Sequence, residues 1–169
     1  SGGTDTIKTS TTNGGLLSIH NWQVGASADD LELSVGGISA EMSGDIVELT
    51  DETADIANGD AVVFVTTTTT QDLASQTGNI LVINADMADA DITNDLEATG
   101  THAITTEGAF AANDGLLIMW DDGVDSYLSV VATGNTRSNT TFTAGDLTQT
   151  NLVKFVGISD VTTIVAGNF

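Results

Sequence analysis

Short runs of apolar residues, separated by clusters of Gly, Asn and Asp, set the pattern of this chain. Runs of four or five residues have the length of β-strands, and the alternation within Leu31–Val35 is typical of a strand with one face on a core. We expect strands at 16–19, 31–35, 46–49, 61–65, 80–83, 116–120, 127–131 and 152–156. Their number and spacing predict an all-β fold, a sandwich or β-roll of about eight or more short strands.

Two of these runs, 62–65 and 116–120, are apolar at every position and are predicted to be central strands. Helix signals are sparse. The stretch 89–98 begins with acidic residues, places Ile92 and Leu96 one turn apart and stops before Gly100, which predicts a short helix. A second short helix is expected at 70–76 with Thr70 as its N-cap, and the threonines at 66–70 predict an exposed strand edge or a loop.

The composition favours one folded domain spanning residues 1–169. Hydrophobic residues make up 40% of the chain, which is too many for a disordered acidic tail. The chain has no cysteine, so disulfides, thiol nucleophiles and thiolate metal sites are excluded. It also has no proline, so its turns must depend on Gly, Asn and Asp.

The charge is strongly one-sided, with 24 acidic residues against 3 basic ones and a formal net charge of -21. Such a surface repels nucleic acid and acidic lipid, so neither is expected as a partner. No apolar run reaches the length of about 18 residues that a transmembrane helix needs, so membrane insertion is not expected either. Cations are the natural counterpart, and carboxylate oxygens are the ligands that calcium prefers.

The clearest candidate site is the stretch from Trp120 to Val131, in which an apolar run enters an acidic turn and leaves as a second strand. This pattern predicts a β-hairpin with crowded carboxylates at its tip, where a calcium ion would relieve their repulsion. The predicted calcium ligands are Asp121, Asp122 and Asp125, with Asp86, Asp89 and Asp91 as a second cluster. The alternative is that these carboxylates are only solvated.

Catalytic patterns are weak. His20 and His102 are the only histidines, neither lies beside a nucleophile motif, and both are expected to be surface or loop residues. Paired carboxylates such as Asp29–Asp30 could serve glycoside hydrolysis, but a chain this acidic contains such pairs by composition alone. We therefore expect no enzyme.

Several motifs in the chain resemble the C-terminal regions of bacterial repeats-in-toxin (RTX) and S-layer-like proteins exported by type I secretion. Residues 3–7 match the back half of a calcium-binding nonapeptide, and 121–128 match an acidic DDGxDSYL hairpin. An acidic loop at 143–147 and a closing segment at 152–162 follow. The family also has a segment of the form Asp-Thr-Ile-x-x-Phe followed by Asp-x-Leu-x-Leu, which residues 5–7 and 30–33 resemble. The chain departs from the family in having no aromatic residue near position 10 and no second nonapeptide.

The resemblance implies that the chain is the C-terminal fragment of a longer protein, with 1–12 as a remnant of upstream repeats. It also implies an uncleaved secretion signal at 158–169, read by the type I secretion machinery, whose apolar residues are Ile158, Val161, Ile164, Val165 and Phe169. The alternative for this segment is a last β-strand docked on the core. The expected function is a non-enzymatic module of a secreted or cell-surface protein, with calcium-assisted folding and assembly into a homo-oligomer or surface lattice. The alternative function is a calcium-dependent adhesin or ligand-binding module.

Overall fold

The computed structural model describes residues 6–9, 16–24, 29–49, 51, 54–106, 108–137 and 140–169. Its centre is a six-stranded mixed sheet in the order β2-β10-β9-β8-β6-β4. The strands are β2 (Leu17–His20), β4 (Phe64–Thr67), β6 (Ile80–Asp86), β8 (Gly115–Asp121), β9 (Ser126–Thr133) and β10 (Leu147–Val156). Only β9 runs antiparallel to its neighbours; the pairs β10–β2, β6–β8 and β4–β6 are parallel.

The middle of the sheet is buried on both faces. Every residue of β8 and of β9 is buried, which explains why 116–120 in β8 is apolar at every position. The two strands form a hairpin in which Trp120 pairs with Tyr127, and their rings stack with centroids 4.3 Å apart. The hairpin is therefore anchored beside its turn by a large aromatic contact.

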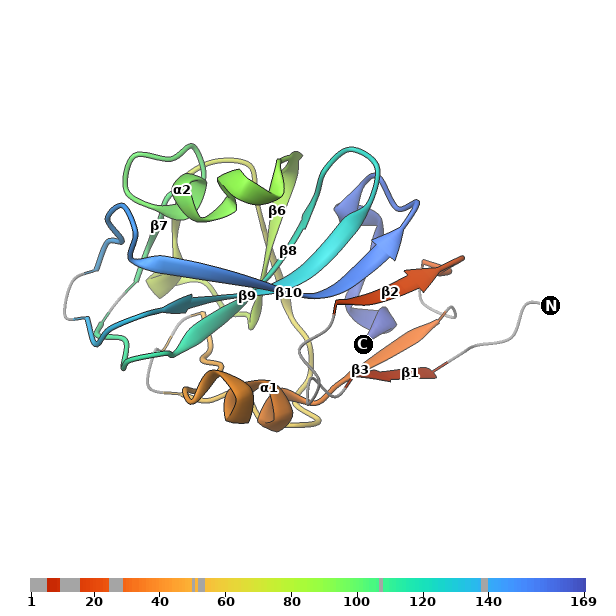
Figure 1. The fold of residues 1–169 in the computed structure, drawn as a ribbon, viewed down its shortest axis with the longest axis horizontal. Helices are drawn as coiled ribbons and strands as arrows, with labels where there is room; N and C mark the ends of the chain where they lie inside the picture. Colours follow the sequence, from red (N-terminus) through yellow and green to blue (C-terminus); the bar gives the residue numbers. More distant parts are fainter. Residues whose placement is uncertain are drawn as a thin grey trace.

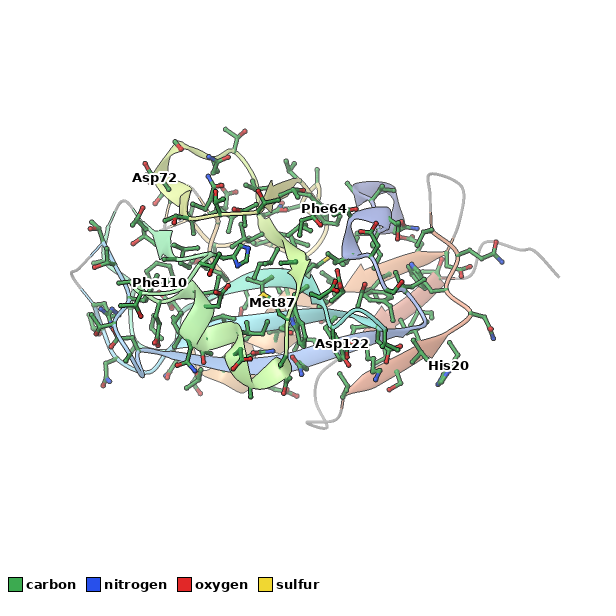
Figure 2. The ribbon with its side chains drawn as sticks, turned by 90° about the horizontal axis from the view of Figure 1, so that it is seen from above. His20, Phe64, Asp72, Met87, Phe110 and Asp122 are labelled. Atoms are coloured by element: carbon green, nitrogen blue, oxygen red, sulfur yellow. The ribbon has the colours of Figure 1, made fainter. Side chains whose placement is uncertain are left out.

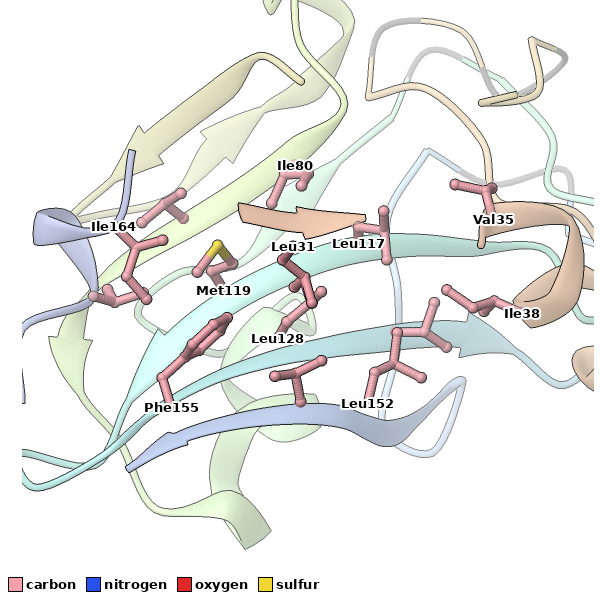
Figure 3. Close-up of a cluster of buried hydrophobic side chains, with 14 of the residues drawn as sticks. Leu31, Val35, Ile38, Ile80, Leu117, Met119, Leu128, Leu152, Phe155 and Ile164 are labelled. Carbon is pink, nitrogen blue, oxygen red and sulfur yellow. The ribbon is translucent and has the colours of Figure 1, made fainter. Parts of the chain in front are cut away.

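Short elements cover each face of the sheet. One face carries α1 (Val35–Met42), the parallel pair β1 (Thr6–Thr9) with β3 (Asp30–Leu33), and two 3-10 turns, η3 (Val161–Thr163) and η4 (Ala166–Asn168). Figure 3 shows part of this cluster, in which Leu31, Val35 and Ile164 pack against sheet residues such as Leu117 and Phe155. We call it the lower cluster, because α1 lies below the sheet in Figure 1.

The upper cluster lies on the opposite face, under α2 (Ile92–Leu96), the 3-10 turns η1 (Leu73–Ser75) and η2 (Asp89–Asp91), and the small pair β5 (Gln71–Asp72) with β7 (Ile104–Thr105). Ile92 and Leu96 are both fully buried there. Their spacing places both side chains on one face of the short helix, and this face is the one that packs on the sheet.

The predicted all-β fold is confirmed, and the described residues form ten strands and two short α-helices. The strands expected at 16–19, 80–83, 116–120, 127–131 and 152–156 are present as β2, β6, β8, β9 and β10. The helix expected at 89–98 is present as η2 followed by α2. None of the described helices has the length and apolar character needed to cross a membrane.

Four local predictions were wrong in part. The strand expected at 31–35 ends at Leu33, because Val35 begins α1. The run 46–49 forms only isolated bridges, at Ile46 and Val47. The predicted central strand at 62–65 is β4, which lies at the edge of the sheet and extends to Thr67. The helix expected at 70–76 is a single 3-10 turn whose N-cap is Asp72 rather than Thr70.

The N-terminal repeat-like stretch, 1–12, is described only in part. Residues 1–5 and 10–12 lie outside the described residues, and with them most of the half-repeat at 3–7. Residues 6–9 form β1, which pairs in parallel with β3 in the register Thr6 to Asp30.

Candidate functional site

The turn between β8 and β9 is held by its own carboxylates. Asp122 Oδ1 accepts hydrogen bonds from the backbone N–H groups of Val124 (2.9 Å) and Asp125 (2.7 Å), and Asp122 Oδ2 accepts one from the Tyr127 hydroxyl (2.9 Å). Burial acts to raise the pKa of Asp122, but these hydrogen bonds together lower it. Asp122, labelled in Figure 2, therefore stays ionised and closes the turn.

Asp125 connects the hairpin to β10 and to the residue that follows it. Its Oδ2 lies 2.6 Å from Lys154 Nζ, and its Oδ1 accepts a hydrogen bond of 2.6 Å from the Gly157 N–H. These two contacts, the first of them the larger, lower the pKa of Asp125, and the same carboxylate raises the pKa of Lys154. Lys154 also lies 5.3 Å from the centre of the Tyr127 ring, so the cation is held from two sides.

Asp121 is the most enclosed carboxylate of the turn, with 2% of its surface exposed. It accepts a hydrogen bond from the Val161 N–H at Oδ2 (3.0 Å) and one from the Gly123 N–H at Oδ1 (3.2 Å). It is also paired in register with Asp86 at the carboxyl ends of the parallel strands β8 and β6. Burial first, and then the neighbouring Asp86 carboxyl, raise the pKa of Asp121.

The second predicted cluster is divided between different contacts. Asp89 Oδ1 accepts hydrogen bonds from Gln149 Nε2 (3.1 Å) and Asn151 Nδ2 (2.6 Å) on β10. Asp86 and Asp91 instead line a neighbouring pocket of 270 Å³ together with Asp95, Thr101 and His102, among other residues. Asp89 therefore contacts β10, whereas Asp86 and Asp91 line the pocket.

Of the six predicted ligands, Asp86 and Asp121 are the two that the structure pairs. Within the described ranges, no group of three or more His, Asp or Glu side chains is arranged to hold a metal ion. Most of the predicted ligands accept hydrogen bonds from the protein itself, as the preceding distances show. Calcium binding therefore stays a prediction, and the Asp86–Asp121 pair is its best remaining location.

The C-terminal segment lies directly against the acidic turn. Ser126 Oγ donates a hydrogen bond of 2.7 Å to the Ile158 carbonyl, next to the contacts that Asp125 and Asp121 make with Gly157 and Val161. The alternative expectation of a closing β-strand is wrong, because 158–169 contains the 3-10 turns η3 and η4. The segment nevertheless docks on the core, as that alternative expected.

The five apolar residues of the predicted secretion signal have different surroundings. Val161 and Ile164 are buried in the lower cluster, and Ile158 and Phe169 pack against that cluster. The Phe169 ring meets the Phe64 ring edge-on with centroids 5.6 Å apart, whereas Val165 is 37% exposed. Whether this segment is read by a secretion system stays a prediction.

Several buried polar residues escaped the sequence reasoning, and Glu97 and Asn168 are two of them. Glu97 Oε1 accepts hydrogen bonds from the N–H groups of Gly145, Asp146 and Leu147. Asn168 Nδ2 donates to the carbonyls of Asp29 (2.9 Å) and Gln23 (3.4 Å). Their partners lie about 50 to 145 residues away in the chain, so no local motif could have indicated these contacts.

His102 was expected to be a surface or loop residue, and the surface part of that expectation is wrong. It lies in a turn but is 5% exposed, and its Nδ1 is hydrogen bonded to Asp95 Oδ2. His20, in contrast, is exposed on the edge strand β2 and points away from the protein (Figure 2).

A further pocket of 180 Å³ opens on the α1 side of the sheet. Its walls are mainly apolar and include Leu33, Val62, Ile80 and the Phe169 side chain of the C-terminal segment. Asp60 also lines it. The pocket is thus partly built by the same segment that the acidic turn holds in place.

No protein-family model, no curated protein and no solved structure matches this chain. The resemblance to RTX and S-layer-like proteins therefore rests on the motifs described above and stays a prediction.

Proposed function

We propose that the chain is a non-enzymatic structural module of a secreted or cell-surface bacterial protein. In this proposal calcium assists its folding, and the segment 158–169 doubles as a type I secretion signal. The observation that carries it is the buried Asp121 carboxylate, which faces Asp86 and at the same time holds the Val161 N–H of that segment.

The physical argument concerns two carboxylates held side by side. Their mutual repulsion and the burial of Asp121 disfavour the doubly ionised pair, as the raised pKa of Asp121 indicates. A calcium ion at Asp86 and Asp121 would remove this penalty, with turn carbonyls or water completing its coordination. In a cytoplasm poor in calcium the segment would be held less firmly, which suits export of an unfolded chain, and external calcium would then favour the folded state.

Calcium titration followed by thermal unfolding at constant ionic strength tests this proposal. An ion that binds only the folded state adds about 2.7 kcal/mol of stability at a hundredfold excess over Kd. We expect calcium to raise the melting temperature of the natural chain, and to raise that of Asp86→Asn much less. The matched control is Glu41→Gln, which removes one charge from an exposed position on α1 and should keep the full response.

A melting temperature that chelator leaves unchanged would contradict calcium-assisted folding. The acids would then act only as hydrogen-bond acceptors and surface charge.

The export signal is tested separately. Residues 113–169 are fused to a passive reporter in a cell with a matching type I exporter, and a second fusion lacks 158–169. We expect reporter in the medium only from the first fusion. Equal secretion from both would leave the segment with a structural role alone.

A ligand-binding or adhesin module is the second candidate, because the apolar pocket beside Phe169 carries an acidic rim at Asp60. This geometry fits a small ligand with an apolar body and a cationic group. Binding of a cationic, apolar dye that is lost in Val62→Trp, which fills the pocket, would favour this function. Unchanged binding in the variant would count against it.

A further inference from the structure

The pocket of 270 Å³ beside α2, which we call the His102 pocket, has a built polar lining. The segment 85–102 forms its walls, from the end of β6 through η2 and α2 to the turn that holds His102. We propose that this pocket binds a small organic cation, a short aliphatic amine whose ammonium group contacts His102 and the carboxylates around it. The inference goes beyond the proposed function and does not depend on it. The polar residues of the walls are Asp86, Asp91, Asp95, Thr101 and His102.

His102 is the buried polar side chain of this pocket, and its ring is held in one orientation. It is 5% exposed, and its Nδ1 is hydrogen bonded to Asp95 Oδ2. Asp95 Oδ1 accepts a hydrogen bond of 2.9 Å from the Thr101 N–H, the residue directly before His102. One carboxylate therefore fixes both the imidazole ring and the backbone that carries it. Because Nδ1 is used in this way, the other ring nitrogen is left for a ligand.

This second nitrogen, His102 Nε2, has no partner in the part of the chain that the structure describes. It is not enclosed by protein atoms either, so it opens on the pocket that His102 lines. Polar atoms of side chains this buried are normally hydrogen bonded, and leaving one without a partner carries a free-energy penalty. A ligand group seated in the pocket would supply the missing hydrogen bond.

The charge of the pocket determines the sign of the ligand. No Lys or Arg among the described residues lines it, and the Asp91 carboxylate has no hydrogen-bond partner in those residues. The three carboxylates of Asp86, Asp91 and Asp95 thus face at most one positive charge, that of a protonated His102. The pocket stays negative in either protonation state of the ring, so it repels an anion and attracts a cation.

The arrangement of these groups favours an organic cation over a metal ion. Within the described ranges, no three His, Asp or Glu side chains are arranged to hold one ion. Acceptors that are spread around a pocket can instead each accept an N–H from a ligand several atoms long.

The size and the apolar part of the pocket limit the ligand further. Pockets for drug-sized ligands have volumes of about 300–1,000 Å³, so a pocket of 270 Å³ suits a smaller molecule. Ala85, Met87 and Ala88 supply apolar wall between the polar groups. A short carbon chain with an ammonium group matches both the wall and the acceptors.

The two histidines of the chain provide the test. His20 is exposed on β2, which three strands of the sheet separate from β6, so it reports any binding that merely follows the overall negative charge. Putrescine, a four-carbon diamine, is titrated into the full chain with a calcium chelator in about 0.15 M NaCl, where long-range attraction is screened. The ring signals of both histidines are followed by NMR and assigned with His20→Gln. We expect a saturable shift at His102 that is several-fold larger than the shift at His20.

Two variants and a neutral analogue serve as controls. Asp91→Asn removes an exposed carboxylate of the pocket, and Glu41→Gln removes an exposed carboxylate of α1, on the opposite face of the sheet. We expect Asp91→Asn to raise the Kd for putrescine several-fold and Glu41→Gln to leave it unchanged. Butanediol, which has the same carbon chain without the charges, should produce no shift at His102.

The contrary outcomes are equally distinct. Equal shifts at His20 and His102, or equal weakening in both variants, would mean that the amine only follows the net charge, and this overturns the pocket. A His102 signal that putrescine does not move overturns it as well. If zinc chloride moves that signal and putrescine does not, the site belongs to a metal ion. None of these results bears on calcium-assisted folding, which is measured by the melting temperature of Asp86→Asn in calcium.

Discussion

At the scale of single residues, many of the acidic side chains that the structure describes accept a backbone N–H. Turns that elsewhere depend on proline or on nearby disulfides are closed here by carboxylates. The acids that accept at least one backbone N–H are Asp29, Asp60, Asp72, Asp95, Glu97, Asp114, Asp121, Asp122, Asp125, Asp146 and Asp160. A large part of the acidic composition is therefore structural.

Glu97 gives the strongest stability prediction of this kind. It is 3% exposed, and its Oε1 is within hydrogen-bond distance of three consecutive N–H groups that begin at Gly145. We expect Glu97→Ala to lower the free energy of unfolding by about 1–3 kcal/mol, because buried donors lose their acceptor. Urea unfolding measures the change. Glu41→Ala, at an exposed position of α1, should be nearly neutral, and an equal loss in both variants would contradict the argument.

The ion pair of Asp146 should account for part of the loss of stability that the protein shows as the pH falls. Its ion pair with Arg137, supported by hydrogen bonds from Thr143, lowers the pKa of Asp146 to about 2. A carboxyl whose pKa is lowered by folding adds stability above its unfolded pKa of about 3.9, and this stability disappears as the pH falls toward the folded value. We expect Asp146→Asn to be less stable than the natural chain at pH 7, with the difference in melting temperature vanishing toward about pH 2. If the difference in melting temperature between the two chains stays constant with pH, the lowered pKa of Asp146 is not its cause.

At the scale of elements, the hydrophobic pattern predicted which segments form strands better than it predicted where those strands begin and end. The all-apolar run 116–120 and the run 152–156 are present as parts of β8 and β10, because buried strands need largely apolar segments of this length. Helix α1 was missed, since it contains Gly36 and Gly37 and has no side-chain N-cap. Its stability comes from packing Val35 and Ile38 into the lower cluster, and local propensity does not report such contacts.

For the candidate site, the sequence predicted the position of the acidic turn but not the residues that contact it. The DDGxDS pattern located the turn, and Gly123, with a φ of 80°, occupies the position that requires glycine. The contacts of the turn with Asp86, Gly157 and Val161 were not predictable. Those residues lie more than 30 positions away in sequence, and only the sheet topology brings them to the turn.

The turn after β10 supplies a prediction at this scale. Gly157 requires a left-handed backbone conformation, and a Cβ there would meet no neighbour. We expect Gly157→Ala to destabilise the protein by about 1–2 kcal/mol through backbone strain alone. Gly134→Ala, also in open space but without a left-handed φ, is the matched control and should change the urea midpoint little. Equal midpoints for the two variants would show that the turn after β10 tolerates a side chain.

At the scale of the whole molecule, the net negative charge opposes the compact folded state. The folded chain concentrates a net charge of -21, and both Arg137 and Lys154 are already paired with carboxylates. The remaining acids repel one another across the surface, and this repulsion favours expansion of the chain.

Screening this repulsion should stabilise the protein. We expect the melting temperature to rise as NaCl is increased from about 0.01 M to about 0.5 M, because the screening length falls from about 30 Å to a few Å. The two ion pairs weaken in the same range, but they are fewer than the repulsive pairs. A melting temperature that falls with salt would mean that these ion pairs dominate the electrostatics.

The position of β10 between β2 and β9 has a consequence for the order of events during synthesis. β2 lies near the start of the chain, yet its partner in the sheet is a strand that begins at Leu147. Two of the five pairings of the sheet, β10–β2 and β6–β8, join segments more than 30 residues apart in sequence, and such non-local pairings slow folding. A nascent chain on the ribosome cannot complete this sheet until β10 has emerged, so N-terminal residues remain without their partner throughout most of translation. Folding is thereby delayed by topology alone, and a newly made chain stays accessible to whatever cellular machinery handles unfolded polypeptides.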